Sequence, residues 1–109
     1  MTISTHVLDA SAGQPAVGVA LSLSFAALPG GWVPVESGET DGDGRHRFGS
    51  ATEPGTYRVV FGTGAYFAAR GVAAFYPEVT VTFTVTDPGA HYHVPLLLSP
   101  FAYSTYRGS

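Results

Sequence analysis

The stretch that decides the fold is Val79–Thr86, which reads Val-Thr-Val-Thr-Phe-Thr-Val-Thr. Apolar and polar side chains alternate along it with a period of two, which places them on opposite faces of a β-strand. β-Branched and aromatic residues suit the pleated surface of a sheet, and threonine suits its less buried face. The stretch therefore predicts a strand with one face in a hydrophobic core.

The same alternation recurs on both sides of this strand. Residues 17–25 place Val, Val, Leu, Leu and Phe on one face, and residues 57–61 repeat the pattern after Pro54-Gly55. Turn-forming groups such as Asp87-Pro88-Gly89 separate the runs. Short strands at this spacing predict an all-β sandwich or barrel.

One segment departs from this pattern. Residues 64–70 are rich in alanine and are followed by Gly71, which predicts a short helix with a glycine stop. No linker, internal repeat or low-complexity segment divides the chain. Its 109 residues therefore predict a single domain, 1–109, with one modest core.

The charge content limits the possible partners. Charged residues make up 12% of the chain and apolar residues 45%, so part of the surface is expected to be covered by other subunits. A net charge of −3 with only five basic residues argues against nucleic-acid binding. No run approaches the roughly 20 apolar residues of a membrane span. The N-terminal residues do not resemble a signal peptide, so a soluble, cytoplasmic protein is expected.

The histidines stand out on the predicted strands. In residues 91–98, Tyr92 begins the more apolar face, so His91 and His93 are expected to point outward beside Leu97. An outward leucine among imidazoles suits a subunit interface. His6 alternates in the same way in its own strand. If the terminal strands are neighbours, His6, His93 and Tyr106 converge on one outward patch.

Two groups of residues are candidate metal ligands. Imidazoles at positions 91 and 93 share a strand face and are possible zinc ligands, but the sequence offers no evident third ligand, because His46 stands beside a glycine-rich loop. The Asp41-Gly42-Asp43-Gly44 repeat invites a calcium site but lacks the spacing and closing glutamate of an EF-hand. No metal site is predicted. With cysteine absent, no disulfide forms.

Three separated segments now point to a family. Ser4–Asp9 reads Ser-Thr-His-Val-Leu-Asp, Thr40–Arg45 reads Thr-Asp-Gly-Asp-Gly-Arg, and the chain ends in Tyr-Arg-Gly-Ser at Tyr106–Ser109. Together they resemble the transthyretin-like 5-hydroxyisourate hydrolases, over Ser4 to Ser109. The Tyr-Arg-Gly-Ser tail is the signature that separates these enzymes from the hormone-carrying transthyretins.

The resemblance implies a transthyretin-like two-sheet sandwich of about eight strands with one short helix. It also implies hydrolytic ring opening of 5-hydroxyisourate, a product of urate oxidation, to 2-oxo-4-hydroxy-4-carboxy-5-ureidoimidazoline without a metal or organic cofactor. The low charge and the outward Leu97, with the resemblance, predict a homotetramer made of two dimers, with sites where the dimers meet.

The implied site combines catalytic and substrate-binding residues. The catalytic set is His6, Arg45, His93 and Ser109, and the substrate-binding set is His6, Arg45, Tyr106, Arg107 and Gly108. Imidazoles titrate near neutrality and suit a general acid and base. Which histidine takes which role stays open, with a preference for His6 activating the water in a network with Ser109. The planar fork of Arg45 suits carbonyl or carboxylate oxygens; its alternative role is a surface ion pair with nearby aspartates.

Two other functions are compatible with the same fold. A transthyretin-like carrier holds a small aromatic ligand without catalysis, and a structural sandwich assembles through its outer faces. A hydrophobic carrier has no need of His6, Arg45, His93 or the polar tail. A nucleophilic serine triad is disfavoured because no Gly-x-Ser-x-Gly elbow is present. The enzyme is the preferred interpretation.

Overall fold

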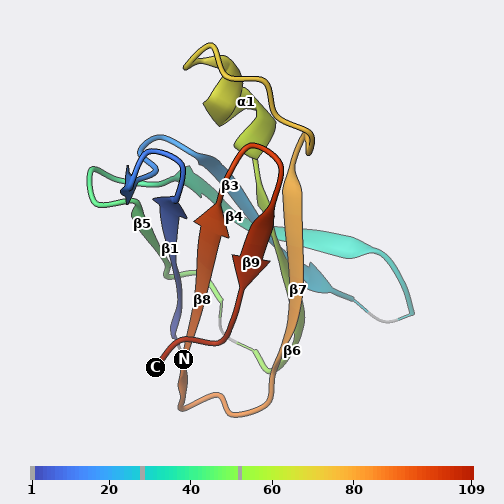
Figure 1. Cartoon of the computed structure of the whole chain (residues 1–109). Coiled ribbons are helices and arrows are strands. Elements are labelled where there is room, and N and C mark those ends of the chain that lie inside the picture. Colours follow the sequence, from blue (N-terminus) through green and yellow to red (C-terminus); the bar gives the residue numbers. More distant parts are fainter. Residues whose placement is uncertain (1, 28, 52) are drawn as a thin grey trace.

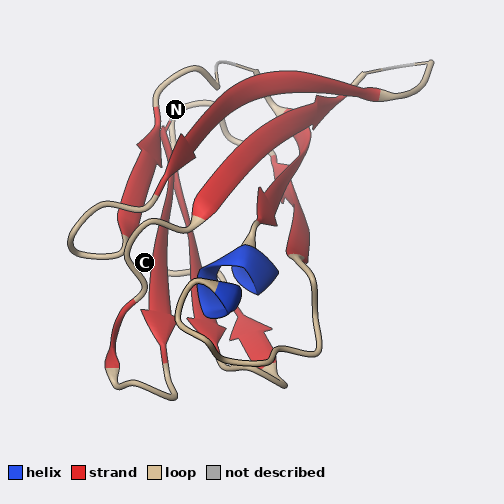
Figure 2. Ribbon diagram, turned by 90° about the horizontal axis from the view of Figure 1, so that it is seen from above, coloured by secondary structure: helices blue, strands red, loops and turns tan. Residues whose placement is uncertain are grey.

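Two β-sheets packed face to face form the protein, with one short helix at one end (Figures 1 and 2). The computed structural model describes residues 2–27, 29–51 and 53–109. In chain order the elements are β1 Thr2–Asp9, β2 Gln14–Pro15, β3 Ala20–Ala26, β4 Trp32–Glu39, β5 Arg45–Phe48, β6 Gly55–Phe61, α1 Thr63–Ala68, β7 Val79–Val85, β8 His91–Leu98 and β9 Tyr103–Thr105.

The two sheets differ in how their strands pair. One sheet has the order β4-β3-β6-β7, and all its pairs are antiparallel. The other has the order β2-β1-β8-β9, with β5 also pairing β1. Its central pair, β1 and β8, is parallel, which brings the beginning of the chain beside a strand close to its end. This pair carries the candidate site.

Apolar side chains from both sheets fill the space between them. The fully buried core comprises Ile3, Val7, Val19, Leu23, Phe48, Tyr57, Val59, Phe61, Phe67, Val79, Val85 and Leu96. Burying one such side chain contributes roughly 1.5–3 kcal/mol relative to leaving it exposed. The core therefore holds both sheets in place and leaves their outward faces for polar residues.

The strand predictions are confirmed, with two differences. In β8 the side chains of Tyr92, Val94, Leu96 and Leu98 are buried, and those of His91 and Leu97 are exposed, as the alternation predicts. In β7, Val81 is only half-buried because the strand is at a sheet edge. Val17 is 44% exposed and precedes β3, so the apolar run that was predicted to begin there begins only at Val19.

The predicted helix is also present, over Thr63–Ala68 and followed by Gly71. Tyr66 connects it to β1, because its hydroxyl donates to a carboxylate oxygen of Asp9 over 2.9 Å. Burial opposes ionisation of Asp9, but this bond and three from Ser11 and Ala12 outweigh it and lower its pKa. In the described residues no helix is long and apolar enough to cross a membrane.

Candidate active site

Strand pairing lines up polar residues on the outward face of the β5-β1-β8 sheet. Ser4 is the register partner of Arg47 on one side and of His93 on the other. In the adjacent row, His6 is the partner of Arg45. The alternation that sends Ile3 and Val7 into the core sends these residues outward. Residues from three distant parts of the sequence thus form one polar surface.

The loop before β5 positions Arg45. A carboxylate oxygen of Asp41 accepts hydrogen bonds from the backbone N–H groups of Asp43, over 2.9 Å, and Arg45, over 3.0 Å. These bonds, that of Arg45 first, lower the pKa of Asp41. Gly44 has φ +76°, and a Cβ there would stand 2.5 Å from the carbonyl oxygen of Val7, so only glycine fits. Asp41 therefore orders the turn through its backbone bonds.

The C-terminal tail crosses the beginning of β8 (Figure 1). The backbone N–H of Gly108 donates to the carbonyl oxygen of His93 over 2.9 Å. A Cβ on Gly108 would lie 2.5 Å from Cδ2 of His93, so the tail and the imidazole are in direct contact. This bridge brings Ser109 to the polar surface.

A polar pocket of about 380 Å³ lies where these segments meet. The residues that line it are Ser4, Thr5, Asp41, Arg45, His46, Arg47, His91, His93 and Ser109. Its size is in the range of small-molecule sites. Two guanidinium groups with imidazole and hydroxyl groups suit a polar or anionic ligand that offers several oxygen atoms.

His93 is the most constrained imidazole of this pocket. Its Nδ1 lies 2.8 Å from the hydroxyl oxygen of Ser4. Burial disfavours the charged ring, and the positive charges of His91, His6 and Arg45 disfavour it further, so the pKa of His93 lies below its ordinary value. The His93 ring therefore stays neutral down to a lower pH than the ring of a free histidine.

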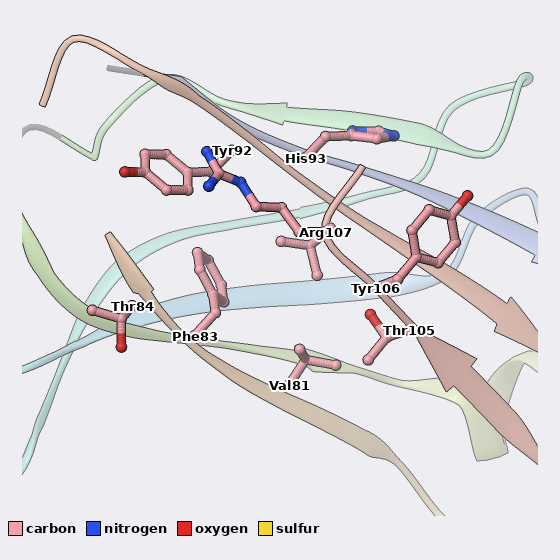
Figure 3. Close-up of a pocket in the computed structure, with 9 residues that line it drawn as sticks. Val81, Phe83, Thr84, Tyr92, His93, Thr105, Tyr106 and Arg107 are labelled. Carbon is pink, nitrogen blue, oxygen red and sulfur yellow. The ribbon is translucent and has the colours of Figure 1, made fainter. Parts of the chain in front are cut away.

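A second pocket, apolar in lining, lies beside the first (Figure 3). Tyr106 and Arg107 line it with side chains from β7, and of the polar pocket's residues it shares His93. The Arg107 guanidinium lies over the ring of Tyr92, 4.5 Å from its centroid. Tyr106 is 59% exposed. In this chain the two residues therefore border a neighbouring pocket.

His46 and the two histidines of β8 are the candidate metal ligands. Nε2 of His46 is 3.0 Å from a carboxylate oxygen of Glu36, which ties β5 to β4. Among the described residues no group of three or more His, Cys, Asp or Glu side chains is arranged to hold a metal ion.

The sequence-predicted residues thus fall into two groups. Arg45, His93 and Ser109 meet in the polar pocket, Gly108 packs on His93, and His6 pairs with Arg45 on the same face. Tyr106 and Arg107 lie outside it. The other six residues that line the pocket were not predicted as site residues, and three of them, Ser4, Arg47 and His91, carried a signal in the sequence. The available signal was their spacing, two residues from His6, Arg45 and His93 on the same strands.

A sequence model of the HIUase/Transthyretin family matches residues 3–108. The chain belongs to this family. The 5-hydroxyisourate hydrolase of Salmonella typhimurium is 46% identical over 110 residues, which cover 98% of this chain and 80% of that protein. The structure of Klebsiella pneumoniae 5-hydroxyisourate hydrolase superposes with a TM-score of 0.88 at 37% identity, over the whole of both chains.

Transthyretin from Sparus aurata is equally close in structure, with a TM-score of 0.90 at 38% identity over 97% of this chain and 95% of that one. The family thus joins proteins named as enzymes and proteins named as transthyretins on one fold. The fold cannot separate them, so the residues of the site must.

Proposed function

We propose that the chain hydrolyses 5-hydroxyisourate to 2-oxo-4-hydroxy-4-carboxy-5-ureidoimidazoline in urate catabolism. The observation that carries this proposal is the polar pocket in which Arg45, His93 and Ser109 meet. Relatives at about 45% identity, such as that of Salmonella typhimurium, carry the name of this enzyme. Opening an amide-like ring bond requires an activated water, stabilisation of an oxyanion and a proton for the departing nitrogen.

Residues of the pocket, together with His6 beside Arg45 on the same sheet face, can meet these requirements. His6 activates the water, with the hydroxyl of Ser109 in its network. Arg45 and His93 polarise the ring carbonyl, and the Arg45 guanidinium stabilises the negative charge that develops on its oxygen. Losing one preorganised donor of this kind costs about 2.7–4 kcal/mol of transition-state stabilisation. His93 then gives a proton from Nε2 to the departing nitrogen.

The C-terminal tail supplies the other residues that are proposed to bind the substrate. Gly108 holds the tail against His93 through its backbone bond. Tyr106 and Arg107 remain proposed substrate contacts; the exposed ring of Tyr106 can turn about its side-chain bonds to stack on a planar ligand. The guanidinium, imidazole and hydroxyl groups of the pocket suit the carbonyl oxygens of the substrate.

The direct test is to generate 5-hydroxyisourate from urate in situ and to follow its ultraviolet decay. The proposal expects decay well above the spontaneous rate in the presence of the protein. The alternative is a transthyretin-like carrier, which the similarity to the Sparus aurata structure supports. Such a carrier would leave the decay unchanged. Unchanged decay would exclude the enzyme.

The proposed assembly is a homotetramer of two dimers. Exposed apolar residues on the outward face, Leu8 and Leu97, are register partners and support a contact between copies. Sedimentation at micromolar concentration is expected to show a species about four times the 11.3 kDa chain mass. A single monomeric species would refute it. The cytoplasmic location stays a prediction, which cell fractionation can test.

A further inference from the structure

A continuous chain of hydrogen bonds lies behind His93 on the outward face of β1 and β8. The Ser4 hydroxyl oxygen is 2.8 Å from Nδ1 of His93 and 3.2 Å from Nε2 of His91. The Thr2 hydroxyl contacts Nδ1 of His91. The two rings stack with centroids 6.2 Å apart and planes 16° apart. Parallel pairing creates this order, because Thr2 and Ser4 are the register partners of His91 and His93.

This arrangement couples the proton positions of the two rings. A hydroxyl between two ring nitrogens can donate to one and accept from the other. When Ser4 donates to Nδ1 of His93, His93 carries its proton at Nε2, and His91 donates to Ser4 from its own Nε2. When Ser4 donates to His91, His93 carries its proton at Nδ1 and its Nε2 is free to accept. The state of His91 therefore sets the tautomer of His93.

We propose that Ser4 and His91 form a proton relay that serves His93 during ring opening; the relay rests on the proposed hydrolase function. The cycle starts with His91 protonated on both nitrogens and neutral His93 protonated at Nε2. As the C–N bond breaks, the Nε2 proton of His93 goes to the departing nitrogen. The Ser4 hydroxyl proton moves to Nδ1 of His93, and the Nε2 proton of His91 moves to the Ser4 oxygen.

The second half of the cycle restores the relay. Water addition has made the ring carbonyl into a carboxylic acid, which is ionised at neutral pH. Its proton goes to Nε2 of His93, the Nδ1 proton of His93 returns to Ser4, and the Ser4 proton returns to His91. The other water proton, taken by His6, leaves to solvent, so one proton is released per turnover.

The surroundings of the two rings favour a positive charge on His91 over a positive charge on His93. His91 is exposed, where a charged ring is hydrated, whereas His93 is half-buried. The charged and titratable groups around His93 are His91 on its own strand, His6 on β1, Arg45, His46 and Arg47 on β5, Asp41 in the preceding loop, and Arg107 in the tail. The two arginines of β5 and Arg107 are cationic, and burial together with neighbouring charge lowers the pKa of His93. Because of the relay, His93 exchanges protons while its own ring stays neutral.

Replacing Ser4 tests the relay in turnover. Ser4→Ala keeps both rings but breaks the link, so kcat is expected to fall roughly a hundredfold, at the lower end of general acid–base effects, while KM changes less than about twofold. Ser4→Thr keeps a hydroxyl and is expected to recover most of kcat. Ser22→Ala is the matched control on the outward side of the other sheet, with activity unchanged. Wild-type kcat in Ser4→Ala would overturn the relay.

A measurement without substrate separates the relay from the hydrolase proposal. The ¹⁵N chemical shifts of the His93 ring report which nitrogen carries the proton. Wild-type His93 is expected to favour the Nε2–H tautomer, and both Ser4→Ala and His91→Phe are expected to lose this preference. The same His93 tautomer in the wild type and in both variants would overturn the relay. Failure of 5-hydroxyisourate hydrolysis by the wild type, with this coupling intact, would instead reject the proposed function.

Discussion

The outward faces of the two sheets differ sharply although their inward faces are alike. Both sheets place buried valine, leucine and aromatic side chains in the core. On the β3-β6-β7 side the outward residues include the exposed threonines Thr80, Thr82 and Thr84. On the β5-β1-β8 side they are imidazoles, guanidinium groups and the Ser4 hydroxyl, grouped around one pocket.

Alternation alone makes a sheet face polar, whereas the pairing of distant strands gathers polar residues into a site. Burial follows the period of two in β1 of one sheet and in β6 and β7 of the other. Among the strands that the structure describes, only β1 has a parallel neighbour from the end of the chain on one side and an antiparallel neighbour from its middle on the other. That meeting gathers Arg45, His6 and His93 on one surface. Four measurements test whether the β5-β1-β8 face acts as a site and the other face does not.

Deleting Tyr106–Ser109 is expected to have the largest effect. The deletion removes Ser109 from the pocket and the Gly108 bond to His93 together, so hydrolysis of 5-hydroxyisourate should collapse toward the spontaneous rate. The free energy of unfolding should fall far less, about 1 kcal/mol for the lost hydrogen bond, because the core lies elsewhere. Ultraviolet assays and thermal melts measure the two effects.

Tyr106→Phe and Ser109→Ala should each lower turnover less than the deletion. Full activity of the truncated chain would show that the tail has no catalytic part.

Arg45→Lys is expected to come next. The change keeps the charge but removes the planar fork, so kcat should fall roughly a hundredfold, as when an oxyanion donor is lost. Arg58→Lys makes the same substitution in the other sheet, where Arg58 lies over the ring of Trp32, 4.3 Å from its centroid. That variant should keep wild-type turnover and show only a change in melting temperature. Wild-type turnover in both variants would mean that Arg45 has no part in catalysis.

Gly108→Ala should have a smaller effect on the same side. The added Cβ meets the His93 ring at 2.5 Å, so either the ring or the tail must move, and we expect kcat to drop about tenfold, since small misplacements of reacting groups are costly. Gly30→Ala is the matched control, because nothing lies within 4 Å of its added Cβ. Steady-state kinetics and the His93 ring resonances report the displacement. An unmoved ring with unchanged kcat would contradict the close packing.

The smallest effect expected is on stability as a function of pH. The pKa of His93 is lower in the folded chain than its ordinary value of about 6.5, so the unfolded chain binds more protons between the two values. Stability should therefore be complete above about pH 6.5 and decline as the pH falls through this window. In His93→Gln, denaturant titrations from neutral to mildly acidic pH should show a shallower decline. The same slope in both proteins would argue against the lowered pKa.

Much of the fold was determined locally. The two-residue alternation of Val79–Thr86 and His91–Leu98, and the alanine-rich segment before Gly71, predict strands and a helix that the structure contains. Side chains on a strand point alternately to either face, so burial of Tyr92 and exposure of His91 follow from position alone. The limits of each run were less certain: Val17 fits the pattern but lies outside β3 because a turn precedes the strand.

The chemical groups of the site can be identified from local motifs: Arg45, His93 and the Tyr-Arg-Gly-Ser tail all stand out in the sequence. Which of these groups meet depends on how the strands pair in the folded chain. Ser4 reaches His93 because β1 pairs with β8 in parallel, and 89 residues separate the two in the chain. The same packing turns Tyr106 and Arg107 toward a neighbouring pocket. Register between distant strands is set by how the whole core closes, and local alternation cannot encode it.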